Sequence, residues 1–228
     1  MGFLFDSLKT ALAMIFEFNP EVYITVWTSL YVSSIAIVFA TLAGVPAGLA
    51  VGLGRFPGRR AVITILNTLM ALPTVVVGLV VYGFLSRVGP LGQFGLLFTP
   101  AAMVIGQIIL ATPIIANYTL GALSSSDSRI MPTALTLGAS TTRGAMVLLQ
   151  EIRFGVMAAI IAGFGRIIAE VGVAMMLGGN IRGYTRTMTT AIALETSKGE
   201  FAFGLALGIF LLSVALLINM FLNFLQQR

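Results

Sequence analysis

Two charged side chains lie inside a long apolar stretch of the sequence. The segment GFGRIIAEVGVAMMLGGN, residues 163–180, places Arg166 and Glu170 four positions apart. On a helix this spacing brings both side chains onto one face, where a guanidinium and a carboxylate can pair. Because a charge that faces lipid is costly, both should face the protein interior or water. We favour a structural clamp near a pathway; the alternative is that Arg166 guides an anion while Glu170 keeps it from binding too tightly.

A group of polar side chains follows directly after this stretch. Hydroxyl groups and arginines suit a tetrahedral dianion, since both donate hydrogen bonds and arginine also neutralises charge. Neutral hydroxyl groups further suit a conduit, which must release what it binds. An ordinary polar loop that caps helix ends explains the same composition equally well. Together with Arg166 and Glu170, the candidate pathway residues are Asn180, Thr185, Arg186, Thr187 and Thr189.

Most enzymatic chemistry is excluded by what the sequence lacks. The chain has no cysteine and no histidine, so thiolate catalysis, histidine bases and histidine metal sites are ruled out. Its two lysines, Lys9 and Lys198, do not belong to a phosphate-binding loop. The glutamates are far apart in the sequence and are not spaced for a metal. We therefore expect neither an enzyme nor a bound metal or cofactor.

The composition is that of an integral membrane protein. Of the 228 residues, 58% are hydrophobic and only 9% are charged, whereas a soluble domain has about a quarter charged residues. The apolar runs are long and continuous rather than alternating, which favours helices over a β-barrel. We expect an all-α integral membrane fold in the lipid bilayer. The net charge of +5 comes from dispersed bases, so nucleic acid is not an expected partner.

About five segments are long enough to span a bilayer, at roughly 20 residues each. Residues 1–20 are expected to form an amphipathic helix at the membrane surface, and residues 21–228 a transmembrane domain. Glycines at 44, 48 and 52 form a small-residue stripe that favours close helix packing. The expected spans are 24–54, 61–87, 100–123, 154–177 and 201–225, with a cytoplasmic loop at 124–153.

Basic residues near the segment ends indicate the orientation. The link RFPGRR, residues 55–60, is short and carries three arginines, which places it in the cytoplasm. Alternation then puts the 124–153 loop and the C-terminus in the cytoplasm and the N-terminus outside. Seven basic residues lie on the expected cytoplasmic side and five on the opposite side. An additional half-span at the N-terminus is the main alternative.

The long cytoplasmic loop has the pattern of a folded hairpin. In MPTALTLGASTTRGAMVLLQEIRFG, residues 131–155, helix-forming apolar positions lie on both sides of a Gly-Ala-Ser break. This pattern predicts two short helices that meet at a turn. Such a hairpin is more often a docking element than a merely solvated connection.

The number of spans suggests an assembly of two copies. Five helices are few for enclosing a hydrophilic pathway, and an odd number cannot be divided into two equal inverted repeats. A second copy related by a two-fold axis meets both requirements. We therefore expect a homodimer of about ten spanning helices.

Two stretches resemble a known family. TALTLGASTTRGAMVLLQEI resembles the cytoplasmic signature loop of type I ABC importer permeases, although Pro132 and Thr133 replace the usual Glu-Ala, and Gln150 and Glu151 lie near the position of the usual Leu-Pro. FGRIIAEVGVAMMLGGNIRGYTRTMTTAI resembles the corresponding stretch of molybdate, tungstate and sulfate permeases. The continuation AIALETSKGEF is most similar to the tungstate branch. The resemblance covers about residues 23–225.

The resemblance implies a division of labour between chains. It implies a homodimer in the cell inner (plasma) membrane, a separate cytoplasmic ATPase that binds ATP and Mg²⁺, and an extracytoplasmic oxyanion-binding protein. This chain would supply the pathway for a tetrahedral oxyanion, most specifically tungstate, and a coupling helix that fits a groove on the ATPase. The coupling residues implied are Ala134, Gly138, Ala139, Ser140, Thr141 and Arg143.

Two other functions fit the composition. One is an ion-gradient-driven transporter or channel that works without an ATPase, and the other is a membrane scaffold. Oxyanion flux through the purified chain alone would favour the first, whereas neither flux nor ATPase binding would favour the second.

Overall fold

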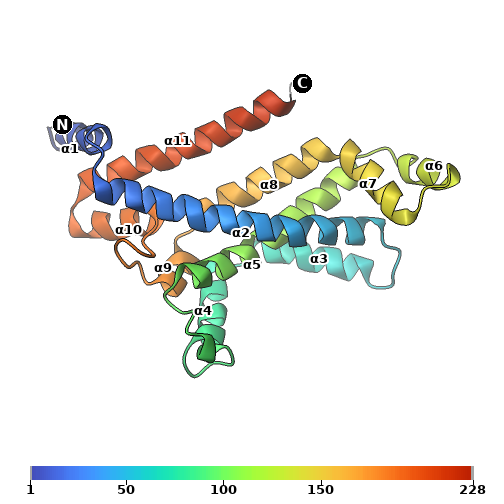
Figure 1. Cartoon of the computed structure of the whole chain (residues 1–228), viewed down its shortest axis with the longest axis horizontal. Helices are drawn as coiled ribbons and strands as arrows, with labels where there is room; N and C mark the ends of the chain where they lie inside the picture. The colour runs from blue at the N-terminus through green and yellow to red at the C-terminus, as the bar shows by residue number, and fades with distance from the viewer. Residues whose placement is uncertain (1, 227–228) are drawn as a thin grey trace.

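The computed structural model describes residues 2–226, and the regular elements within this range are all helical (Figure 1). The helices are α1 (Gly2–Phe16), α2 (Pro20–Leu53), α3 (Arg59–Met70), α4 (Thr74–Leu85), the short 3-10 helix η1 (Gly92–Phe94), α5 (Pro100–Ser124), α6 (Ile130–Thr136), α7 (Thr141–Glu151), α8 (Arg153–Ile168), α9 (Gly172–Gly178), α10 (Met188–Lys198) and α11 (Phe201–Gln226). This confirms the all-α expectation.

Helices α2 and α5 form the centre of the fold and make its most extensive helix–helix contact. Each begins at a polar cap followed by a proline: Asn19 accepts a hydrogen bond from the N–H of Glu21 at 3.0 Å, and Thr99 caps α5. The predicted glycine stripe lies in their contact. A Cβ added at Gly48 would lie 2.4 Å from the carbonyl oxygen of Ala116. The two backbones therefore touch, as the spacing predicted.

The expected span 61–87 is not one helix. Helices α3 and α4 meet at a 98° bend, and Pro73 occupies the position before the first residue of α4. Proline has no N–H to donate and clashes with the preceding turn, so it favours such a break. By contrast, Pro46 lies inside α2 and Pro113 inside α5. These two prolines belong to the helices that pack most closely, where neighbours can hold the backbone.

The expected span 154–177 is also divided. Helix α8 ends at Ile168 and α9 begins at Gly172. Glu170 lies between the two helices, and its carboxylate accepts a hydrogen bond from the N–H of Val173 at 3.2 Å. The side chain therefore caps the first turn of α9. Helix α8 instead forms a bent pair with α7, at 72°.

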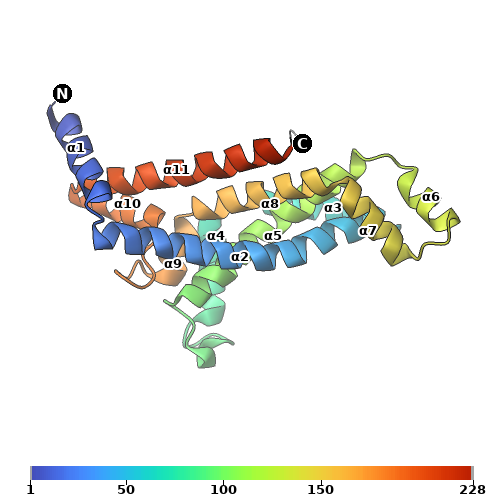
Figure 2. The same cartoon turned by 45° about the horizontal axis from the view of Figure 1, so that its top comes forward.

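Three helices are long and apolar enough to cross a membrane, or up to five if each bent pair is counted as one span. The three are α2, α5 and α11, whose bounds lie within a few residues of the expected 24–54, 100–123 and 201–225. Figure 2 shows them together with α8 running along the long axis of the molecule. In both views α4 projects away from this group.

The N-terminal helix α1 packs against the start of α11. The rings of Phe3 and Phe201 lie 5.7 Å apart, and Ala11 is fully buried. The hydroxyl of Tyr23 donates to the carbonyl of Ile15 at 2.9 Å, which fixes the angle between α1 and α2. Several large apolar side chains of α1 remain exposed, Phe5 among them. The placement of this helix at the membrane surface stays a prediction.

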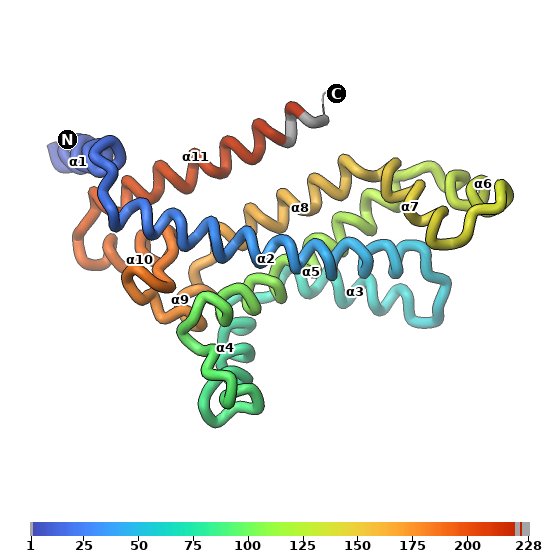
Figure 3. Tube along the Cα trace, viewed as in Figure 1, coloured from blue at the N-terminus to red at the C-terminus, as the bar shows by residue number. Residues whose placement is uncertain are grey.

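Helices α6 and α7 form the hairpin that the loop sequence predicts. Gly138 lies between them with a φ of +85°, in the left-handed region that favours glycine. The hairpin lies at the end of the molecule opposite α1 and α10 (Figure 3). The two elements for which the sequence suggested functions are therefore far apart along the long axis.

Candidate substrate pathway and docking hairpin

The Arg166–Glu170 pair forms as the spacing predicted. The Nη1 of Arg166 donates to the Oε2 of Glu170 at 3.0 Å. The environment is asymmetric, because the Glu170 side chain is 3% exposed whereas that of Arg166 is 41% exposed. The carboxylate also caps α9, so the pair holds the end of α8 against the start of α9. The pair therefore links the two helices through a buried carboxylate, while its guanidinium stays partly exposed.

The hydroxyl-rich segment folds inward. The buried hydroxyl of Thr185 accepts from a backbone N–H at 3.0 Å and donates to a backbone carbonyl at 2.5 Å. Thr187 caps α10, and the hydroxyl of Thr189 donates to the carbonyl of Glu170 at 2.7 Å. Asn180 donates to a carbonyl of α10 at 3.5 Å. These groups bond within the chain, so their contact with a substrate stays a prediction.

Arg186 is the centre of a network of five charged residues, which we call the Arg186 network. Its Nη1 lies 3.2 Å from the carboxylate of Glu21 and 3.3 Å from that of Glu195. Arg182 also pairs with Glu21, and Lys198 lies 3.1 Å from Glu195. The network joins the start of α2, the loop before α10 and α10 itself. Arg186 therefore has a structural role, and its predicted place on the pathway stays a prediction.

The predicted docking residues are all on the α6–α7 hairpin. The Ser140 side chain accepts from the N–H of Arg143 at 3.4 Å and caps α7. Ala134 and Ala139 line a cavity of about 620 Å³ between the two helices. The residues involved are Ala134, Gly138, Ala139, Ser140, Thr141 and Arg143. Their exposed position suits contact with another chain, which stays a prediction.

An exposed ion pair lies just before the hairpin. The Nη2 of Arg129 lies 2.7 Å from the Oδ2 of Asp127. The side-chain hydrogen bonds from Arg129, together with its backbone N–H, hold the pKa of Asp127 below its ordinary value of 3.8. The same pairing raises the pKa of Arg129. Asp127 is therefore a stable anion at neutral pH.

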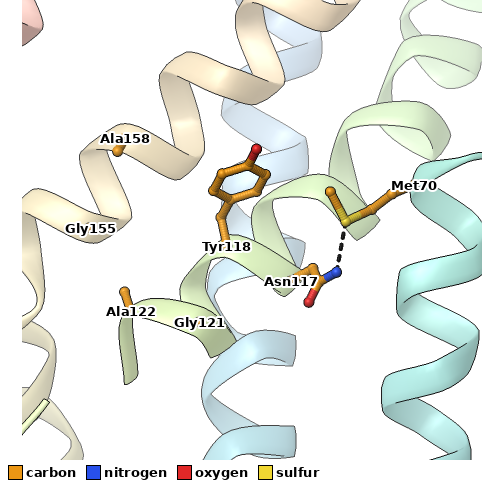
Figure 4. A pocket seen from close by; sticks show the side chains of 7 residues that line it. All are labelled: Met70, Asn117, Tyr118, Gly121, Ala122, Gly155 and Ala158. Atoms are coloured by element: carbon orange, nitrogen blue, oxygen red, sulfur yellow. Dashed lines mark hydrogen bonds between the residues drawn. The ribbon is translucent and has the colours of Figure 1, made fainter. Parts of the chain in front are cut away.

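The sequence interpretation missed a largely apolar pocket between α3, α5 and α8, whose lining includes Asn117 and Tyr118. Asn117 donates to Asn67 at 2.5 Å and lies 2.7 Å from the sulfur of Met70. Figure 4 shows Asn117 turned toward Met70 and the ring of Tyr118 extending on the side of α8. The pocket has a volume of about 480 Å³. The available signal was the presence of amides inside apolar segments.

Residues 44–228 match the family described as the binding-protein-dependent transport system inner membrane component. This match covers most of the chain. The chain belongs to this family. As a member of a family of inner membrane components, it is a membrane protein with several apolar helices.

The chain is similar in sequence to several anion permeases. It is 36% identical to the tungstate uptake system permease protein TupB of Peptoclostridium acidaminophilum, over 100% of both chains. It is 40% identical to the TupB protein of Campylobacter jejuni, over 96% of this chain and 92% of that protein. It is 28% identical to the molybdenum transport system permease protein ModB of Escherichia coli, over 80% of this chain and 83% of that protein.

Solved structures show the same fold at lower identity. A chain of the inward-facing MetNI methionine ABC transporter has a TM-score of 0.73 and 19% identity, covering 90% of this chain and 94% of that one. A chain of a bacterial alginate ABC transporter with a bound periplasmic protein has a TM-score of 0.74 and 21% identity, covering 91% and 79%. The fold of this family member is therefore that of a type I ABC importer permease.

Proposed function

We propose that the chain is the membrane-spanning permease subunit of an ATP-driven importer for a tetrahedral oxyanion, with tungstate as the substrate. The observation that carries this proposal is the 36% identity to a tungstate uptake permease over the full length of both chains. The 40% identity to a second tungstate uptake permease supports it. The fold shared with ABC transporter permeases agrees.

The assembly follows from this function. Two copies of the chain enclose the pathway, an ATPase pair binds from the cytoplasm, and an extracytoplasmic protein delivers the oxyanion. ATP and Mg²⁺ bind to the ATPase, so this chain is a transport subunit rather than an enzyme and carries no cofactor. In this assembly the N-terminus lies outside, and the C-terminus lies in the cytoplasm with the α6–α7 hairpin.

The hairpin is the proposed coupling element. Its turn is exposed, as shown by Leu137 with 82% of its surface accessible, and its helices line an open, mostly apolar pocket. A short helix with a fixed cap can enter a groove on the ATPase and transmit its closure to α8, which follows α7 directly. The 72° bend between α7 and α8 is the connection through which this movement reaches the membrane helices.

The pathway proposal centres on Arg166. Its guanidinium is held by Glu170 and is still 41% exposed, so it can attract an oxyanion without forming a closed binding cage. Pairing lowers the net charge that the oxyanion meets, which favours release. This combines the clamp and guide roles in one pair.

Uptake into liposomes tests the function. The complete transporter, with its ATPase inside and its binding protein outside, should accumulate tungstate only when ATP is supplied to the ATPase. Tungstate flux through the chain without an ATPase would refute the importer and favour the gradient-driven alternative.

The hairpin is tested by a matched pair of glycine substitutions. Gly138 and Gly58 both have a φ of +85°, and a Cβ added at either one would meet nothing within 4 Å. Valine at either position carries the same left-handed strain of about 1–2 kcal/mol. Gly138→Val should reduce ATP-driven uptake while the chain still inserts, whereas Gly58→Val should retain it. Equal uptake by the two variants would contradict the docking role.

A further inference from the structure

One side of α8 consists of small residues and a single charge. Gly155, Ala158, Ala162, Gly165 and Arg166 follow one another at spacings of three, four, three and one, and at 100° per residue they fall on one side of the helix. A Cβ added at Gly165 would meet nothing within 4 Å. This side of α8 is therefore open near Arg166, and its other side chains are small.

The side of α8 that carries Arg166 also contributes to the pocket between α3, α5 and α8. Gly155 and Ala158 line that pocket together with Tyr118, as Figure 4 shows. Eleven residues separate Arg166 from Gly155, which corresponds to roughly 16 Å along the helix. The exposed cation and the pocket thus lie on the same side of α8.

Two hydrogen-bond donors in or beside the pocket are not used by the chain itself. Asn67 accepts a hydrogen bond from Asn117 through its Oδ1, and within residues 2–226 its own N–H₂ group and the hydroxyl of Tyr118 have no hydrogen-bond partner. Asn67 is exposed, and Tyr118 is 48% exposed. Unsatisfied polar groups in lipid cost several kcal/mol. Water, a polar solute or a second copy of the chain must therefore cover them.

The faces expected to meet lipid look different. The exposed residues of α2 and α11 are large and mostly apolar, such as Trp27 at 68% and Leu212 at 73% exposure. The α8 side has small residues, a cation and amides nearby instead. A lipid-facing role accounts for the first two surfaces and leaves the third unexplained.

We propose that the pocket lined by Asn117 and Tyr118, with Asn67 beside it, is an inner station of the pathway, where neutral donors hold the oxyanion after it leaves Arg166. This inference rests on the proposed function. The bond from Asn117 to the Oδ1 of Asn67 leaves the N–H₂ group of this exposed residue free, and the phenol supplies an O–H donor. Neutral donors hold a dianion less tightly than an arginine does, so the oxyanion moves from a charged to an uncharged site on its way to the cytoplasm.

The natural lack of cysteine makes a direct test possible. Tyr118→Cys and Tyr31→Cys are matched, because the parent tyrosines are 48% and 47% exposed, and Tyr31 lies among the large apolar residues of α2. A charged thiol reagent reacts with thiolates in water. In the complete transporter, labelling of this chain should be at least about ten-fold faster for Tyr118→Cys, and millimolar tungstate should slow it.

Each outcome decides the proposal. Equal labelling of the two variants would show that lipid or a second copy covers the pocket, and would overturn it. Fast labelling that tungstate does not slow would also overturn it, because the cleft would hold water and no oxyanion. Wild-type uptake is measured in parallel. Uptake without Tyr118→Cys labelling refutes the station alone, whereas absence of ATP-driven tungstate uptake refutes the proposed function.

A conservative pair gives a second readout. Tyr118→Phe removes only the hydroxyl, and should raise the tungstate concentration for half-maximal binding to the transporter without its binding protein about ten-fold, the effect of one hydrogen bond to a charged group. Tyr31→Phe should leave it unchanged. An unchanged value for Tyr118→Phe would contradict the hydroxyl as a ligand.

Discussion

The asymmetric burial of the Arg166–Glu170 pair predicts unequal effects of removing its two members. Arg166→Met leaves a carboxylate that is 3% exposed, with the N–H of Val173 at 3.2 Å as its remaining partner. Breaking a fully buried pair costs about 3–5 kcal/mol. Because Arg166 is 41% exposed, water already screens part of the interaction, and we expect a loss of about 2 kcal/mol of unfolding free energy.

Glu170→Gln should cost less. The amide oxygen of glutamine can still accept from Val173, and the half-exposed guanidinium left behind is solvated by water. We expect a loss of about 1 kcal/mol. The double variant has no buried charge and keeps the cap, so it should also lose only about 1 kcal/mol, giving a coupling energy of about 2 kcal/mol between the two residues.

Unfolding of the purified chain in mixed micelles with increasing SDS measures these free energies. The exposed Arg129–Asp127 pair is the control, because its side chains are 85% and 45% exposed and water screens their interaction, so that the effects of removing its two members should simply add. If the effects of Arg166→Met and Glu170→Gln add to within about 0.5 kcal/mol, the clamp is refuted. Uptake by the double variant then separates the roles: a guide predicts loss of uptake in a stable protein.

Three further predictions concern packing, charge and pH. Gly106→Ala should destabilise the chain by about 1–3 kcal/mol in the same unfolding assay, because the added Cβ would lie 2.4 Å from a valine side chain of α9. Gly208→Ala is the control and should not destabilise the chain, because a Cβ there would meet nothing within 4 Å. Glu195→Gln removes one of two carboxylates beside the buried arginine of the Arg186 network, and should increase hydrogen exchange at the start of α2 and in α10. Arg129→Gln should raise the pKa of Asp127 toward 3.8, measured by NMR. The contribution of the Arg129–Asp127 pair to stability is fully present above pH 3.8 and is lost as the pH falls through the lowered pKa of Asp127.

Much of the helical framework could be predicted because its causes are local. Continuous apolar runs with Asn19 and Thr99 as caps specify α2 and α5 without reference to the rest of the chain. The glycine-containing break specifies the α6–α7 hairpin in the same way. The four-residue spacing of Arg166 and Glu170 sufficed to predict their ion pair.

The remaining features depend on tertiary contacts that a sequence does not display. Three prolines have similar apolar surroundings, yet only Pro73 lies at a break, because the close α2–α5 contact supports the helices that contain Pro46 and Pro113. Glu21 and Arg186 pair although 165 positions separate them. The threonine hydroxyls suggested an anion pathway but bond within the chain, since a donor that suits an anion suits a carbonyl equally well.

The backbone contact between α2 and α5 also has a mechanical consequence. With 34 residues, α2 is a rod about 50 Å long, and at Gly48 its backbone packs directly against that of α5. Its first turn belongs to the Arg186 network, and the carbonyl groups of its last turn are held by Arg59. We expect the two helices to tilt together as a lever. A tilt of about 5° over the helical rise of such a rod moves one end by roughly 4 Å relative to the other, enough to couple opposite faces of a bilayer without any helix having to unfold.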